Sequence, residues 1–201
     1  EVEVKNVKSE GKLIINKKNS DLPPLKSSNS LNELESMYAA LKLGLSDYVG
    51  KNNFKKVLVG LSGGIDSALT ATIAVDALNS NNVIGVAMPS KFNAKSSLED
   101  AKELANNLNI ELKTIIIEET ADKFRKLLKE SISEDLKSVV DENIQSRIRG
   151  NLLMGLSNQL GAMVVATGNK SEMAVGYSTL YGDLAGGFAL LKDVYKTEVY
   201  N

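Results

Sequence analysis

The spacing of hydrophobic residues changes several times along the chain, and each change predicts a new element. Apolar residues three and four positions apart from Leu31 to Tyr48 predict an amphipathic helix. Ser30 and Glu33 fit a capping box at its start, and Gly50 fits its C-cap. From residue 56 onward, short runs rich in Val and Ile alternate with longer stretches of helical period. We therefore expect strands and helices to alternate over most of the chain.

The expected elements define a fold class. The pattern predicts strands at residues 56–61, 83–88, 110–117 and 162–167. It predicts helices at residues 66–78, 98–108, near 120–130 and about 139–160, the second of them behind a capping box of Ser96 and Glu99. Because the strands are continuous apolar runs separated by helices, we expect an α/β fold with a doubly wound parallel sheet and helices on both faces.

The first part of the chain has a different composition. Residues 1–18 alternate weakly and read as an edge ribbon or the tail of something longer. Residues 19–30 hold Pro23, Pro24 and several serines, which is typical of a linker. We therefore expect a boundary near residue 30, with one domain over residues 31–201.

Missing residue types restrict the chemistry. The 201 residues include no Cys and no His, which excludes thiol nucleophiles, disulfides, imidazole bases and thiolate zinc sites within this chain. Any metal would be held by oxygen ligands, which favours Mg²⁺. The net charge of −1 gives no basic field for nucleic acid or membrane, and no apolar run predicts a membrane span or signal peptide. The expected location is the cytoplasm.

A polar, glycine-containing segment joins the first expected strand to its helix. It comprises Gly60, Leu61, Ser62, Gly63, Gly64, Ile65, Asp66 and Ser67. Adjacent glycines and a helix N-terminus favour an anion such as a phosphate, and a carboxylate beside that phosphate requires a cation between them. A Mg²⁺-nucleotide meets both conditions. The alternative is a plain glycine turn whose Asp and Ser cap the helix.

A second polar turn, residues 167–172, follows the fourth expected strand. If that strand lies beside the first, Thr167 and Glu172 face the glycine segment across the crevice where ligands bind in open parallel sheets. Asp66 and Glu172 could then be two oxygen ligands of one Mg²⁺. Alternatively, Glu172 is a first-turn residue that complements the helix dipole.

The long helix carries a buried stripe and a polar flank. Asn143 and Arg147 lie four residues apart beside the stripe and suit an anionic or nucleotide-like ligand. Alternatively, Arg147 belongs to an ordinary surface and pairs with Asp141 or Glu142. The stripe is predicted from apolar residues at every fourth position: Val140, Ile144, Ile148, Leu152, Leu156 and Leu160.

Several ordered motifs resemble those of a known family. The glycine segment matches the phosphate loop of the ATP pyrophosphatases, called the PP-loop, whose members cleave ATP between its α- and β-phosphates. Residues 141–149, 165–172, 175–183 and 191–197 follow it in order and are similar to NAD⁺ synthetases. The resemblance runs from about Leu34 to the end of the chain.

The resemblance implies roles for particular residues. It implies ATP contacts at Gly60 to Ser67, Thr167 and Lys196, metal contacts at Asp66 and Glu172, and a catalytic role for Asp66, Glu172 and Lys196. The deamido-NAD⁺ contacts that it implies are Asn143, Arg147, Glu172, Tyr177, Ser178, Thr179 and Leu180. From its chemistry alone, the Tyr177 ring offers a face for stacking. Alternatively, Lys196 is an ordinary solvated lysine of a helix.

The motifs resemble the glutamine-dependent subtype, in which a glutaminase domain precedes the synthetase. Leu180 stands where ammonia-dependent enzymes tend to carry Lys. The glutaminase is nitrilase-like and uses a Cys nucleophile, so residues 1–30 would be its tail and linker. The family domain continues beyond the Y-K-T segment at residues 195–197, so the chain resembles a fragment. The resemblance also implies a homo-oligomer, at least a dimer, with small-molecule substrates.

The implied activity is ATP-dependent amidation of deamido-NAD⁺ to NAD⁺ through an acyl-adenylate, with release of AMP and pyrophosphate. No side-chain nucleophile is needed, which suits a chain without Cys or His. Two alternatives stay open. One is another PP-loop ligase with a different acceptor, and the other is an ATP-binding module without turnover.

Overall fold

The computed structural model describes residues 31–91, 95–132 and 135–201. Within this part, residues 32–201 form one compact unit. The linker expected before residue 30 and the capping residue Ser30 lie outside the described residues. None of the described helices is long and apolar enough to cross a bilayer.

A single parallel sheet forms the centre of this unit. Its strand order is β3-β2-β1-β4-β5, so the order reverses beside β1, which pairs with both β2 and β4. This confirms the doubly wound α/β fold and the expected position of the fourth strand beside the first. The strands are β1 (Val57–Leu61), β2 (Val83–Ala87), β3 (Glu111–Thr114), β4 (Met163–Ala166) and β5 (Phe188–Ala189).

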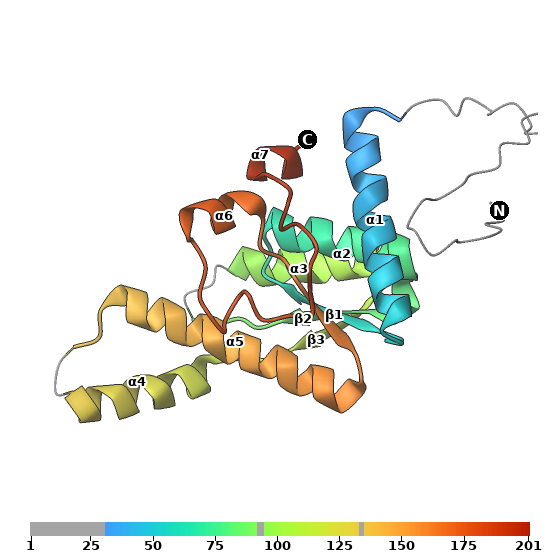
Figure 1. Ribbon diagram of the computed structural model, residues 1–201. Coiled ribbons are helices and arrows are strands. Elements are labelled where there is room, and N and C mark those ends of the chain that lie inside the picture. The colour runs from blue at the N-terminus through green and yellow to red at the C-terminus, as the bar shows by residue number, and fades with distance from the viewer. Residues whose placement is uncertain (1–30, 92–94, 133–134) are drawn as a thin grey trace, which may run out of the picture. The chain divides into compact units, whose positions relative to one another are not determined.

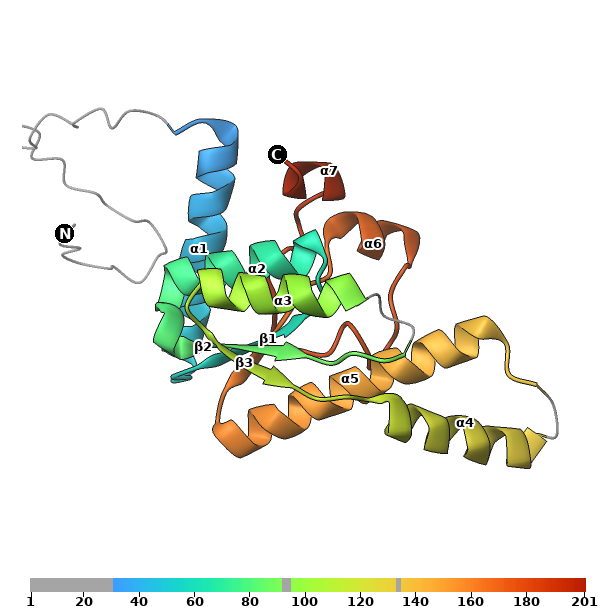
Figure 2. The ribbon, with the colours of Figure 1, turned by 180° about the vertical axis from the view of Figure 1, so that it is seen from behind.

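Helices cover both faces of the sheet (Figures 1 and 2). One face packs against α1 (Glu33–Lys51), α2 (Ile65–Leu78) and α3 (Lys95–Asn107), and the other against α4 (Glu118–Ile132) and α5 (Ser138–Leu160). Successive β1 side chains point to opposite faces, so Val57 and Val59 join the first core and Leu58 the second. The remaining elements are short: η1 (Ser80–Asn82), α6 (Lys170–Val175) and α7 (Lys196–Val199).

Both ends of the first helix differ from the prediction. The N-cap is Asn32, whose Oδ1 accepts from Glu35 N at 2.9 Å while Glu35 Oε2 accepts from Asn32 N at 3.0 Å. The capping box is therefore two residues later than expected, because Asn caps a helix as well as Ser does. The helix continues through Gly50 to Lys51, and Asn52 is its C-cap.

Other boundaries were also wrong. Helix α3 begins at Lys95, so Ser96 is a helical residue and not a cap. Strand β3 ends at Thr114, although Ile115 N and Ile117 N still donate to the carbonyls of Ala87 and Pro89 at 2.9 and 3.1 Å. Strand β5 was not predicted, because two residues are too few to show a period.

The stripe predicted on α5 is only partly buried. Ile144 and Ile148 are buried, but Leu160 is 42% exposed. Every fourth residue of an α-helix advances by about 40° beyond a full turn, so the stripe winds away from the sheet. Further along the helix, the buried face instead includes Leu153, which is 9% exposed.

Candidate functional site

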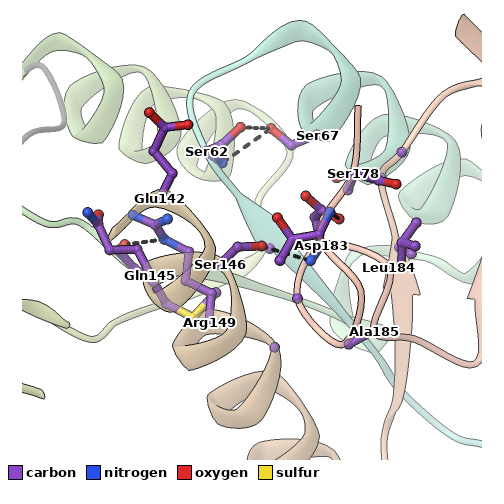
Figure 3. A pocket seen from close by; sticks show the side chains of 18 of the residues that line it. Ser62, Ser67, Glu142, Gln145, Ser146, Arg149, Ser178, Asp183, Leu184 and Ala185 are labelled. Carbon is purple, nitrogen blue, oxygen red and sulfur yellow. Dashed lines mark hydrogen bonds between the residues drawn. The ribbon is translucent and has the colours of Figure 1, made fainter. Parts of the chain in front are cut away.

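A cleft of about 1100 Å³ opens beside β1 at the point where the strand order reverses. This central cleft is walled by the loop after β1, the end of β2, helix α5, the turn after β4 and the segment 176–185 (Figure 3). Ligands bind at such points in open parallel sheets, and single-ligand pockets usually measure about 300–1,000 Å³. The volume of the central cleft therefore lies at the upper end of the range for ligand pockets.

The loop between β1 and α2 is built from glycines and serines. Gly63 has φ of +81°, and a Cβ atom there would lie 2.6 Å from the carbonyl oxygen of Ser97. Ser67 Oγ donates to the Gly64 carbonyl at 2.8 Å, and Gly64 N donates to Ser62 Oγ at 3.2 Å. The N-cap of α2 is Gly64, which has no side chain to cap the helix. The loop is therefore better suited to binding an anion at the start of α2 than to capping the helix with its own side chains.

Asp66, in the first turn of α2, is held from two sides. Asn169 Nδ2 donates to its Oδ1 at 3.1 Å, and Lys196 Nζ forms an ion pair with its Oδ2. The Asp66 side chain is 18% exposed and that of Lys196 is 33% exposed. Lys196, expected beside ATP, thus neutralises Asp66 in this structure.

The position of Glu172 is compatible with both roles considered from the sequence, a ligand of a metal and a residue in the first turn of a helix. It is the third residue of α6, and its Oε2 accepts from Asn169 N at 3.1 Å while its own N donates to Asn169 Oδ1 at 3.0 Å. This capping box stabilises the start of α6. Glu172 also lines the central cleft, as Asp66 does.

The site fits a hard divalent cation. Asp66 and Glu172 both bond to Asn169, and the ammonium of Lys196 already occupies a cation position on Asp66. Within the described residues, no group of three or more acidic side chains is arranged to hold a metal. Mg²⁺ is commonly bound by one or two carboxylates together with substrate phosphates. The two carboxylates beside the glycine loop meet that requirement.

Asn143 and Arg147 hold the segment that follows α6. Thr179 Oγ1 donates to Asn143 Oδ1 at 2.8 Å, and Arg147 Nε donates to the Leu180 carbonyl at 3.2 Å. Asp141, considered as a partner of Arg147, pairs with Arg125 instead. The polar flank of α5 therefore holds residues 177–180 through these hydrogen bonds.

The same segment packs closely on α5 further along. Ser146 Oγ accepts from Asp183 N at 3.0 Å (Figure 3). A Cβ atom at Gly150 would lie 2.9 Å from the carbonyl oxygens of both Tyr181 and Gly182. Small residues on α5 therefore allow the backbone of this segment to approach the helix.

The predicted site residues divide into two groups. The central cleft is lined by Gly60, Leu61, Ser62, Asp66, Ser67, Asn143, Thr167, Glu172, Tyr177, Ser178 and Thr179. The residues that lie outside its lining are Gly63, Gly64, Ile65, Arg147, Leu180 and Lys196. Gly63 and Gly64 border a second hollow of about 260 Å³, between α2 and α3.

Sequence reasoning missed several residues of the cleft. Arg149 Nε donates to the Met88 carbonyl at 3.0 Å, and burial lowers the pKa of its guanidinium. Gln145 Nε2 donates to Asp141 Oδ2 at 3.0 Å. The available signal was the charged Arg149, one turn before the apolar Leu152 and Leu153 of the expected helix.

Comparisons with known proteins agree on one family. The family model for NAD synthase matches residues 37–201. The glutamine-dependent NAD(+) synthetase of Aquifex aeolicus is 57% identical over 168 residues, and that of Thermotoga maritima is 55% identical over 166 residues. These matches cover 84% and 83% of the chain but only 30% and 29% of the relatives. The chain thus spans less than a third of their length.

A solved structure has the same fold. The glutamine-dependent NAD+ synthetase of Acinetobacter baumannii, in complex with adenosine diphosphate, is 45% identical with a TM-score of 0.85. The match covers 88% of this chain and 34% of that protein. The architecture and the sequence motifs therefore point to the same family.

Proposed function

Since the chain belongs to the NAD synthase family, we propose that it performs the synthetase reaction of a glutamine-dependent NAD⁺ synthetase. The reaction is the ATP-dependent amidation of deamido-NAD⁺ to NAD⁺. Ammonia would come from glutamine hydrolysis in a domain with a Cys nucleophile, a residue type absent from these 201 residues. The nucleotide-bound relative supports ATP as one substrate.

One observation carries this proposal. The glycine loop after β1 and the turn after β4 are tied together through Asp66, Asn169 and Glu172 at the edge of a cleft of about 1100 Å³. The loop supplies backbone N–H groups and the hydroxyls of Ser62 and Ser67 for phosphates. The opposite wall, from α5 and residues 176–185, is the surface for the second substrate.

The proposed chemistry has two steps. A carboxylate oxygen of deamido-NAD⁺ attacks the α-phosphorus of ATP, a new O–P bond forms, and the bond to pyrophosphate breaks. Ammonia then attacks the acyl carbon, a C–N bond forms, the nitrogen releases a proton to water, and AMP leaves with the oxygen that joined it to the acyl group. No enzyme nucleophile takes part, so the protein contributes positioning and charge stabilisation.

Individual residues support the first step. Gly60 to Ser67 and Thr167 bind the ATP phosphates and hold the α-phosphorus in line with the carboxylate. Asp66 and Glu172 would hold Mg²⁺, which supplies positive charge to the phosphate oxygens. Lys196 lies beside Asp66 and would turn toward the departing pyrophosphate.

The second substrate would rest on α5 and the segment after α6. Tyr177 is 75% exposed and offers a stacking face, and Ser178 and Thr179 offer hydroxyl groups at the cleft. Asn143 and Arg147 hold this segment through Thr179 and Leu180, and Glu172 borders it. The resemblance further supports assembly into at least a dimer and a cytoplasmic location.

The direct test is to incubate the protein with ATP, Mg²⁺, deamido-NAD⁺ and ammonium and to measure NAD⁺ and AMP. We expect equal amounts of both from the parent and none from Asp66→Asn. The matched control is Asp76→Asn, on the same helix α2 but facing Tyr38 of α1, which should keep the activity. Product from Asp66→Asn at the parent rate would contradict the assigned role of that carboxylate.

The two alternatives give different results in this assay. Another PP-loop ligase would bind ATP but form no NAD⁺ from deamido-NAD⁺. A module that only binds ATP would form no AMP with any acceptor. The proposed function requires both products together.

A further inference from the structure

Asn169 lies between the two acidic residues of the central cleft and is fully buried, with 0% exposure. We propose that Asn169 is a positioning residue that holds Asp66 and Glu172 in place for the divalent cation. The inference rests on the proposed function only in taking these two carboxylates as the cation's ligands. The spacing of Asn169 and Glu172 fits a helix cap, but nothing in the sequence motifs indicates the contact with Asp66.

Every polar group of Asn169 that faces the site is in use. Its Oδ1 accepts from Glu172 N at 3.0 Å, and its backbone N donates to Glu172 Oε2 at 3.1 Å. Its Nδ2 donates to Asp66 Oδ1 at 3.1 Å, across 103 positions of sequence. One residue therefore fixes a carboxylate of α2 relative to a carboxylate of α6.

The chemistry of these contacts favours an amide at this position. The side chain must accept from one group and donate to another, and Asn does both without adding charge. An Asp at residue 169 could accept but could not donate to Asp66. A Ser could cap α6, but its shorter side chain would not reach Asp66. Partners that orient metal ligands typically change metal affinity by about 10- to 100-fold when they are removed.

Asn169 and Lys196 hold Asp66 in different ways. Lys196 brings a positive charge to Oδ2 and is 33% exposed, so an arriving cation competes with it for the same carboxylate. Asn169 is neutral, fully buried and bonded to Oδ1. When the cation binds, Lys196 leaves Asp66 and Asn169 stays.

Helix α1 offers a matched case in which the same motif has only a capping role. Asn32 forms the same capping box with Glu35 at an exposed helix start. If Asn169 were only a cap, its replacement would have the consequences of replacing Asn32. The bond to Asp66 is the feature that separates the two positions.

The experiment compares Asn169→Ser with Asn32→Ser, because Ser is as good an N-cap as Asn. Mn²⁺ is titrated into each protein with saturating α,β-methylene ATP, and the thermal midpoint is measured alongside. We expect the Mn²⁺ Kd of Asn169→Ser to rise at least about tenfold. Asn32→Ser should leave that Kd within about twofold of the parent. Asn169→Ser should lose more thermal stability than Asn32→Ser, because Asn169 is buried and its bond to Asp66 is lost.

Other outcomes overturn the inference. An Mn²⁺ Kd for Asn169→Ser within about twofold of the parent would mean that Asn169 does not position the carboxylates. A second variant, Asn169→Thr, keeps a capping oxygen, and failure of both variants to fold would assign Asn169 a purely structural role. NAD⁺ formation by the parent is measured separately. Its absence, with the tenfold difference present, would reject the proposed function and retain the inference.

Discussion

Asp66 is the carboxylate that two other side chains of the site contact. A neutral amide holds one of its oxygens and the ammonium of Lys196 holds the other. The structure thus contains a positive charge where the proposed reaction needs a metal. If Asp66 holds a cation as proposed, cation binding and the position of Lys196 are coupled through this carboxylate.

Lys196→Met tests that coupling. Without the competing ammonium, Mn²⁺ should bind several-fold more tightly in the absence of nucleotide. ATP in the presence of Mg²⁺ should bind more weakly, because the phosphates lose a cationic partner. Isothermal titration measures both affinities, and Lys192→Met, at an exposed position nearby, is the control. Unchanged or weaker Mn²⁺ binding by Lys196→Met would show that the two cations do not compete.

A methyl group added at Gly150 should weaken binding of the second substrate, deamido-NAD⁺. The Cβ atom of Gly150→Ala would meet two backbone carbonyls at 2.9 Å, so residues 181–182 must move. We expect the KM for deamido-NAD⁺ to rise about tenfold or more and the affinity for ATP to stay within about twofold. Overpacking of this kind typically costs about 1–3 kcal/mol of stability.

The control for this substitution lies on the same helix. Gly155 has nothing within 4 Å of an added Cβ atom, so Gly155→Ala should stabilise α5 by about 0.5–1 kcal/mol and leave the KM unchanged. Equal KM values for the two variants would mean that the close approach at Gly150 does not position the substrate segment.

At the scale of elements, a charged cluster joins α4 to α5 and to the turn after β2. Arg125 of α4 forms ion pairs with Glu118, Asp122 and Asp141, the last of which is on α5. Glu118 Oε2 also accepts from Lys91 N at 2.8 Å. This backbone hydrogen bond is the main cause that lowers the pKa of Glu118 from 4.5 to about 2, with a further contribution from Arg125.

The lowered pKa predicts a pH dependence of stability. Because the folded state favours the ionised Glu118, its contribution is complete above pH 4.5 and is lost as the pH falls toward 2. Glu118→Gln should therefore lower the free energy of unfolding by about 1–2 kcal/mol at neutral pH, after allowance for solvent screening. The difference from the parent should shrink through that acidic range, as followed by urea denaturation.

Glu119→Gln is the comparison for this prediction. Glu119 pairs with Lys123 one turn along α4, and its side chain is 83% exposed. Its replacement should change stability little at any pH. A difference between Glu118→Gln and the parent that persists unchanged at pH 2 would contradict the role of the ionised carboxylate.

The elements themselves were largely predictable from the sequence. Apolar runs such as residues 57–61 and 83–87 have the length and composition of buried parallel strands, and they form β1 and β2. Helix ends were harder, because Ser30 and Asn32 are both good caps and the period alone does not choose between them.

The site was predictable only in its local parts. The glycine loop and Glu172 belong to contiguous motifs at strand ends, and Glu172 and the loop residues other than Gly63, Gly64 and Ile65 line the cleft. The bond from Asn169 to Asp66 and the bond from Arg149 to Met88 join residues 103 and 61 positions apart. No spacing rule within one segment encodes such contacts, so sequence reasoning did not find them.

At the scale of the whole molecule, the parallel sheet brings the two halves of the site together. The glycine loop and the turn after β4 are far apart in the sequence, but β1 and β4 are neighbours and their carboxyl ends meet at one edge. The position of the cleft is a consequence of this topology. In the proposed reaction, ATP binds on the β1 side and deamido-NAD⁺ on the α5 side of one continuous cleft.

The most direct test of this account follows one oxygen atom. Deamido-NAD⁺ labelled with ¹⁸O in both oxygens of its carboxylate is incubated with the protein, ATP, Mg²⁺ and ammonium, and the products are analysed by mass spectrometry. Attack of the carboxylate on the α-phosphorus predicts one labelled oxygen in each AMP and none in pyrophosphate. Label in pyrophosphate or phosphate, or NAD⁺ formed with unlabelled AMP, would contradict the adenylation mechanism.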